Sequence, residues 1–367
     1  VNRKTVAWDG TVATGVAKGT GTAEDPFVIT TAEELAYVVA LGTATEGKYY
    51  EIDPSIGAIV LQAPEYAEDI VALNSAADVQ AYFEGGSITP KQWIYKGWAA
   101  NAFCGKFDGN GATIYGLYSD AVKNLNGDSN HNNNSNPALF PAIDAGAEFR
   151  NLAIKNSYIN GKEGWDAGIL SAIVCANNYG VKKVGTIIFD SIIIANNYYR
   201  AGTGRDGLLF ATGQNDIANL SNILVYGNDA KVTDGSTVQI TRAMKNDLKD
   251  ENGEFIFARF SNMVVFGALP YDAKLSYRTS EPQCFSNVYT DSPAGEVYAG
   301  NPFAEEQVKQ ITEADLATLE LGDAWITTDT YPELKAFHDA VFSGDQTASG
   351  AAGHSASCSC GLADSNL

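Results

Sequence analysis

One hydrophobic pattern recurs along the middle of the chain. A large apolar residue is followed by a polar residue, then Asn or Ser, then a run of apolar residues. Successive copies begin 40, 31, 40 and 25 residues apart, at 149–154, 189–194, 220–225, 260–265 and 285–289. A constant motif at a variable spacing is typical of stacked strands joined by loops of different length.

A second apolar element precedes the first three copies. It opens with a turn and enters a strand at 137–140, 167–170 and 206–210. Each repeat is therefore predicted to run turn–strand–turn–strand. Stacking aligns the third position of the motif as a row of Asn151, Ser191, Asn222, Asn262 and Asn287. We predict that this row is a buried ladder, whose amides bond to the turns above and below.

These features predict an all-β fold, a parallel β-helix. Strand content alone does not separate a β-helix from a β-sandwich. The recurring motif and the aligned polar row favour the solenoid, because a sandwich has no reason to repeat one strand motif in register.

Helical signals lie mainly near the ends, where a solenoid needs caps. Thr31 and Glu34 form a capping box before a helix over 32–41, in which the hydroxyl bonds the helix and the carboxylate bonds back to the cap. Gly42 ends this helix. A shorter helix is predicted between Ser75 and the glycine pair that follows it.

Two further helices are predicted near the C-terminus, over 312–321 and over 333–342, with Pro332 as the first residue of the second. The predicted organisation is an N-terminal cap region, a parallel β-helix, a C-terminal helical cap and a flexible Gly/Ser/Ala-rich tail. These parts span 1–45, 46–300, 301–343 and 344–367.

Composition excludes several partners. The formal net charge is −20, which disfavours nucleic acid, because binding polyphosphate needs a basic stripe. No window approaches 18 apolar residues, so membrane insertion is not expected.

The first residues lack an apolar signal core, so any signal peptide is expected to have been removed. Five scattered cysteines do not make a disulfide scaffold, and no role follows for Cys358 and Cys360.

Several stretches resemble secreted and cell-surface bacterial repeat proteins. Residues 8–11 and 19–36 resemble the family's opening segment, W-D-G followed by G-x-G-T-x-x-x-P and T-A-x-E-L. Residues 107–117 resemble its F-D-G-N-G-x-T-I-x-G-L turn, and 331–334 its closing Y-P-x-L. The resemblance implies a right-handed parallel β-helix, extracellular, secreted or displayed on a bacterial surface as an adhesin, glycan-contacting module or stalk. It supplies no catalytic residues.

Candidate ligand-binding residues lie in loops at 123–136, 160–166 and 196–206, which stacking would bring to one side. Aromatic rings beside Asp and Arg suit a sugar, whose apolar face stacks while its hydroxyls bond to polar groups. The alternative is that these are solvated turns. The candidates are Trp165, Asp166, Tyr198, Tyr199, Arg200 and Asp206.

An enzyme of β-helix fold is the second hypothesis. A calcium-dependent polysaccharide lyase needs carboxylates to hold Ca²⁺ and a basic residue, and a hydrolase needs two carboxylates at a defined separation. The residues for such chemistry are Asp166, Asp206, Arg205 and Lys182.

The main hypothesis is a monomeric, non-catalytic adhesin or glycan-binding protein that contacts a polysaccharide or host-surface ligand without a cofactor. A stalk without a ligand is a third hypothesis. A separate aromatic group of Trp93, Tyr95 and Trp98 is read as packing in preference to a binding platform.

Overall fold

The computed structural model describes residues 3–93, 102–120, 137–161, 167–174, 186–202, 207–213, 217–233, 235, 237–241, 252, 258–270, 285–293, 308–328 and 331–342. Strands predominate over helices in these ranges, as predicted. Three sheets are parallel throughout, and only the small β19–β20 sheet is antiparallel among the named strand pairs of the described residues.

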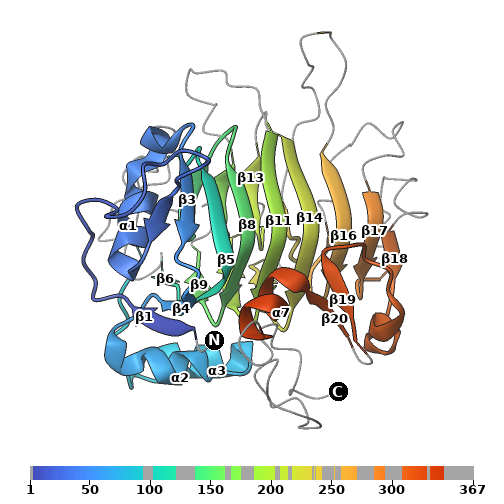
Figure 1. The fold of residues 1–367 in the computed structure, drawn as a ribbon. Coiled ribbons are helices and arrows are strands. Elements are labelled where there is room, and N and C mark those ends of the chain that lie inside the picture. Colours follow the sequence, from blue (N-terminus) through green and yellow to red (C-terminus); the bar gives the residue numbers. More distant parts are fainter. Residues whose placement is uncertain are drawn as a thin grey trace, which may run out of the picture.

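The largest sheet has eleven strands and runs the length of the molecule (Figure 1). Nine strands lie in the order β1-β4-β5-β8-β11-β14-β16-β17-β18, and β2 joins through β3, which pairs with β5. The bounds are β1 (Lys4–Ala7), β2 (Phe27–Ile29), β3 (Tyr49–Ile52), β4 (Ile56–Val60), β5 (Lys106–Tyr115), β8 (Glu148–Lys155), β11 (Thr186–Ala195), β14 (Ile217–Tyr226), β16 (Arg259–Val265), β17 (Phe285–Thr290) and β18 (Val308–Gln310).

Two smaller parallel sheets complete the body. One has the order β15-β12-β9-β6, and the other has the order β13-β10-β7. The bounds are β6 (Tyr118–Asp120), β7 (Phe140–Ile143), β9 (Tyr158–Asn160), β10 (Ser171–Val174), β12 (Tyr198–Ala201), β13 (Phe210–Gly213) and β15 (Asp229–Val232).

The chain visits the three sheets in a fixed order. From β5 in the large sheet it passes to β6, then to β7, and returns as β8 beside β5; the same cycle repeats through β11 and β14. Large parallel sheets built this way are compatible with a parallel β-helix. The expected repeat of two strands was wrong, because each cycle contains a third. That strand has three or four residues, too few for a visible alternation.

The large apolar residue that opens each motif lies in the core, one above the next. Phe149 pairs in register with Phe107 on one side and Phe189 on the other, and the alignment continues to Phe260 and Phe285. The Phe149 and Phe189 ring centroids are 5.8 Å apart. The predicted alignment of the five motif copies is therefore confirmed.

The backbone conformation at the third motif position explains why Asn or Ser occurs there. All five residues of the row have a left-handed φ, between +52° and +58°. Asn and Ser tolerate this conformation because their short polar side chains bond locally. The row is aligned as expected, but its predicted burial holds only for Ser191: the asparagines at 151, 222 and 262 are half-buried, and Asn287 is exposed.

A buried ladder exists at the next corner, between the large sheet and the four-stranded sheet. The Ser157 N–H donates to Oδ1 of the fully buried Asn197 at 2.9 Å. Asn197 Nδ2 donates to Asn228 Oδ1 at 2.9 Å and to the Ile154 carbonyl at 3.2 Å. Asn228 Nδ2 donates to the Ile194 carbonyl at 3.0 Å. These amides join three successive turns of the chain.

The N-terminal helices agree with their sequence signals. α1 (Ala32–Leu41) begins after Thr31, whose hydroxyl accepts from the Glu34 N–H, and α3 (Ala76–Glu84) begins after Ser75. The Glu34 carboxylate departs from the capping box, because it accepts from the Thr30 N–H instead of the cap. The remaining helices of this region are η1 (Gly42–Thr45), η2 (Pro64–Tyr66) and α2 (Ala67–Val71).

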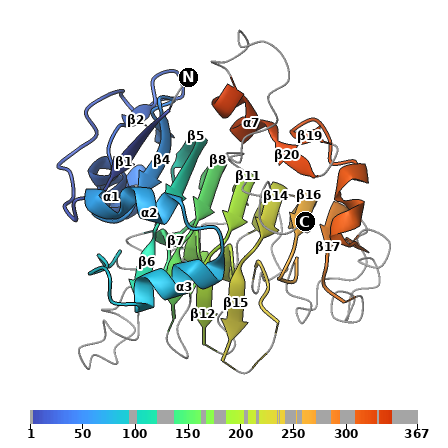
Figure 2. The same ribbon diagram turned by 90° about the horizontal axis from the view of Figure 1, so that it is seen from below.

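α3 lies across the four-stranded sheet (Figure 2). Phe83 of α3 begins a stack of rings that continues through Tyr118, Tyr158 and Tyr198, with centroids 5.2, 5.1 and 4.9 Å apart. The Tyr158 hydroxyl donates to the Glu84 carboxylate at 2.8 Å. Burial, together with this carboxylate, raises the pKa of Tyr158.

After β18 the chain turns back as a segment that we call the C-terminal strap, described at 311–328 and 331–342. It contains η5 (Glu313–Thr318), β19 (Trp325–Thr327), β20 (Pro332–Leu334) and α7 (Lys335–Phe342). Pro332 was expected to begin the last helix, but it lies in β20, where its strand pairs with β19.

The strap lies across the outer face of the large sheet, away from the two smaller sheets (Figure 2). It packs on an apolar stripe formed by the second half of each long strand. The stripe is Ala153, Ile193, Leu224, Val264 and Tyr289, and the strap contributes Leu316, Leu319, Leu321, Trp325, Leu334 and Phe337. Residues 343–367, which include the whole of the predicted tail, lie outside the described residues.

Candidate functional site

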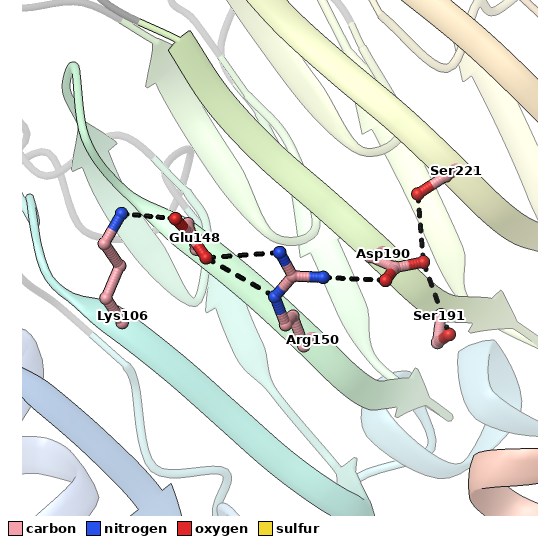
Figure 3. A network of polar contacts seen from close by, with 6 residues as sticks. All are labelled: Lys106, Glu148, Arg150, Asp190, Ser191 and Ser221. Carbon is pink, nitrogen blue, oxygen red and sulfur yellow. Dashed lines mark hydrogen bonds and ion pairs between the residues drawn. The ribbon is translucent and has the colours of Figure 1, made fainter. Parts of the chain in front are cut away.

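The first half of the long strands carries polar side chains on the same outer face. Most of them occupy the positions immediately before and after the inward-facing Phe or Leu of the motif, because successive side chains of a strand point to opposite faces. Figure 3 shows the network that they form across β5, β8, β11 and β14. Its members are Lys106, Glu148, Arg150, Asp190, Ser191 and Ser221.

Opposite charges alternate along the network, in which β8 supplies both Glu148 and Arg150. The Lys106 ammonium pairs with Glu148 Oε1, and Glu148 Oε2 lies 3.3 Å from Arg150 Nη2. Arg150 Nη1 donates to Asp190 Oδ2 at 2.8 Å. Asp190 Oδ1 accepts from the Ser221 hydroxyl at 2.9 Å. Both cations of the network are therefore held by carboxylates of this chain.

A cleft of about 220 Å³ lies at the N-terminal end of this network. The loop residues Ala23 and Pro26 form one wall. The rest of the lining comes from β3, β5 and β8: Tyr49, Tyr50, Glu51, Lys106, Phe107, Asp108, Glu148 and Arg150.

The two tyrosines of the cleft differ in exposure. Tyr49 is 36% exposed, so its ring is open to a ligand, whereas the Tyr50 side chain packs inward against Phe27 and Phe103. Burial raises the pKa of the Tyr50 hydroxyl to about 12, so this group stays neutral at ordinary pH. Tyr49 is thus the aromatic surface that the cleft presents.

Two carboxylates of the cleft are held by amides. Asp108 Oδ1 accepts from the Asn110 N–H at 2.8 Å and from Asn151 Nδ2 at 3.0 Å. Glu51 Oε2 accepts from Asn110 Nδ2 at 3.4 Å. Asn110 lies in the F-D-G-N-G turn and has a left-handed φ of 49°, which turns its side chain toward β3. No cation of the described residues lies within ion-pair distance of either carboxylate.

The C-terminal strap bounds the polar face on its other side. Trp325 Nε1 donates to Asn222 Oδ1 at 3.1 Å, and Asn222 Nδ2 donates to Asp190 Oδ1 at 2.7 Å. These bonds join the strap to the end of the charged network. The open part of the polar face is therefore the part near Tyr49.

The structure places the predicted tyrosines on β12 and not in a loop. Tyr199 is fully buried, and its hydroxyl donates to the Ala167 carbonyl at 2.6 Å, so a ligand cannot stack on it. Tyr198 is 7% exposed and is stacked on Tyr158. The Arg200 guanidinium lies 3.9 Å from the Tyr198 ring centre and pairs with Asp229 at 2.7 Å. In this structure all three side chains are engaged within the protein.

The other candidates named from the sequence lie outside the described residues. These are Trp165, Asp166, Arg205, Asp206 and Lys182, with Tyr95 and Trp98 of the second aromatic group. Trp93 is described: it is buried, packs edge-on against Trp8 at 5.0 Å, and donates to the Leu139 carbonyl. Its predicted packing role is confirmed.

The described residues lack two further features that a functional site could use. Among the described residues, no three His, Cys, Asp or Glu side chains cluster so as to hold a metal ion. In the same ranges, no helix has the length and apolar character needed to cross a membrane.

Comparison with known proteins gives no match to a family model, a curated protein or a solved structure. The candidate site therefore depends on its own geometry.

Sequence reasoning missed Tyr49 and the charged network. The signal was present for part of it, because Lys106, Glu148, Arg150 and Asp190 all lie one position from a motif phenylalanine and so must face outward. Nothing local indicated Tyr49, since its place beside Lys106 depends on the pairing of β3 with β5.

Proposed function

We propose that the protein is an extracellular bacterial surface protein with a right-handed parallel β-helix, which binds a glycan non-catalytically in the cleft beside Tyr49. The observation that carries this proposal is an exposed aromatic ring in a cleft that also presents five charged side chains able to form hydrogen bonds. The cyclic order of strands through three parallel sheets supports the fold assignment. The resemblance to secreted repeat proteins supports the extracellular location.

The cleft offers partners both for the apolar face of a sugar ring and for its hydroxyl groups. A pyranose stacks its apolar C–H face on an aromatic side chain, here Tyr49. Its hydroxyls then donate to carboxylates and accept from cationic groups, and Glu51, Asp108, Lys106 and Arg150 offer both kinds of partner within one cleft.

The site is also preorganised. Lys106, Glu148 and Arg150 are held by one another across neighbouring strands, and Asp108 is held by two amide donors. Side chains ordered before binding lose little conformational freedom when the ligand arrives, which favours affinity. We propose that this sheet face acts without a cofactor, in a monomeric binding module.

Substitution of Tyr49 tests the proposal. Glycan arrays and then calorimetry with plant and host polysaccharides should identify a ligand. Tyr49→Ala should weaken its binding about tenfold or more, because the stacking surface is removed. Tyr49→Phe keeps the ring and should bind within about twofold of the unchanged protein. Failure of every glycan to bind, or full affinity in Tyr49→Ala, contradicts the proposal.

The enzyme hypothesis is tested separately. A polysaccharide lyase forms unsaturated products, so incubation with polyuronates and Ca²⁺ should raise ultraviolet absorbance if it is correct. We expect no such rise and no release of reducing sugar. Turnover of any polysaccharide would replace the binding proposal with an enzymatic one.

A further inference from the structure

We infer that the cleft beside Tyr49 binds uncharged glycan chains and discriminates against polyuronates and sulfated glycans. This inference rests on the proposed function and names the ligand class of that same site. It comes from the way in which the charges lining the cleft are already paired.

The cations of the cleft are committed to carboxylates of the protein. Glu148 lies between Lys106 and Arg150 and contacts both, and Arg150 also reaches Asp190 at 2.8 Å. An anionic ligand group would have to displace one of these built-in partners and leave it unpaired. These pairs are partly exposed, so the exchange gains little: an anion of the ligand offers the cation no more than the carboxylate of the protein already supplies.

Two carboxylates of the cleft, in contrast, have no cationic partner among the described residues. Its charged lining consists of Glu51, Asp108 and Glu148 against Lys106 and Arg150. Glu51 and Asp108 accept only from neutral amides among the described residues. No cation of the described residues pairs with these carboxylates, and they have spare lone pairs, so they accept hydrogen bonds from ligand hydroxyls and repel ligand anions.

The rest of the molecule reinforces this discrimination. The formal net charge of −20 gives the protein a negative long-range field, which slows the approach of a polyanion and leaves a neutral chain unaffected. Repulsion of this kind weakens as salt is added, because exposed charges are screened beyond about 10 Å at 0.1 M salt.

Matched polymers test the inference. Binding of a neutral glucan or of methyl-esterified galacturonan is compared by calorimetry with that of its carboxymethylated or de-esterified counterpart, which has the same backbone with added anions. The neutral member should bind about tenfold tighter or more at low salt. The ratio should shrink at 0.5 M NaCl.

Neutralising Glu51 and Asp108, which have no cationic partner among the described residues, should reverse part of the discrimination against anionic polymers. In E51Q/D108N the affinity for the anionic polymer should rise several-fold relative to the neutral one. E65Q/E68Q, which removes two exposed acids of η2 and α2 outside the cleft, serves as the control for net charge and should leave the ratio unchanged.

The outcomes separate the two proposals. Tighter binding of the anionic polymer, or a ratio that E51Q/D108N does not alter, overturns the inference while glycan binding stands. If neither polymer nor any array glycan binds, the proposed function falls and the inference falls with it.

Discussion

At the scale of single residues, backbone conformation decides where asparagine occurs in the long strands. Each motif copy places Asn or Ser at a left-handed position, where most L-residues are strained. The same residues then use their amides on the outer face, as in the bond from Asn287 Nδ2 to Asn262 Oδ1 at 3.1 Å. The left-handed backbone conformation therefore selects the residue type, and the side-chain hydrogen bonds follow from that choice.

Asn287 provides a clean test, because it is exposed and has a φ of 52°. Asn287→Ala and Asn287→Gly both lose the bond to Asn262, but only Ala is strained by the left-handed backbone. The Ala variant should unfold about 1 kcal/mol more easily than the Gly variant in urea. Equal stability of the two variants would show that the side-chain bond, and not the backbone, selects asparagine.

At the scale of elements, buried amides at the corner hold successive turns together. Asn197 bonds to residues of the preceding turn, Ser157 and Ile154, and to Asn228 of the following turn. In parallel strands the neighbours are far apart in sequence, so such bonds set the register between turns. A buried polar group left without a partner costs about 1–3 kcal/mol.

Asn197→Ala should therefore lower the free energy of unfolding by about 2 kcal/mol, because the Ser157 N–H loses its buried acceptor and Asn228 Oδ1 keeps only the backbone N–H of its two donors. Denaturation in urea should show a lower midpoint at an unchanged slope. Ser286→Ala, at an exposed position of β17, is the matched control and should change stability by less than about 0.5 kcal/mol. An Asn197→Ala midpoint equal to that of the control would contradict the ladder.

At the scale of the whole molecule, acidic residues combine with local donors to make stability depend on pH. Hydrogen bonds from the Ser55 hydroxyl and N–H hold the pKa of Asp53 below its ordinary value of 3.8. Burial acts to raise the pKa of Asp229, but Arg200 and Lys231 outweigh it, and the pKa is lowered.

A carboxyl with a lowered pKa in the folded state stabilises the protein above its unfolded pKa, and this contribution is lost as pH falls through the folded value. The free energy of unfolding should therefore decline as pH falls below about 3.8. Urea titrations at pH 5, 4, 3 and 2.5 measure this decline. Asp229→Asn should be less stable at pH 5 and should show a shallower decline, and a wild-type stability that stays constant down to pH 2.5 would contradict the argument.

Much of the fold could be predicted from local sequence. The strand motif stacks in register, and α1 and α3 begin at the expected caps, because alternation and capping involve residues within a few positions of one another. The third strand of each cycle could not be predicted, since three or four residues carry too little periodicity. Residues 198–200 were consequently assigned to a loop, and Tyr199 to a surface that it does not reach.

The sequence by itself determined that the chain is mainly β, that one strand motif repeats in register, and that the molecule is strongly acidic. Only the tertiary structure decided that β3 lies beside β5, that the strap covers half of the outer face, and that Tyr49 shares a cleft with Lys106, Glu148 and Arg150. The physical reason is separation along the chain. Strand patterns depend on near neighbours, whereas the cleft depends on pairings between segments that are distant in sequence.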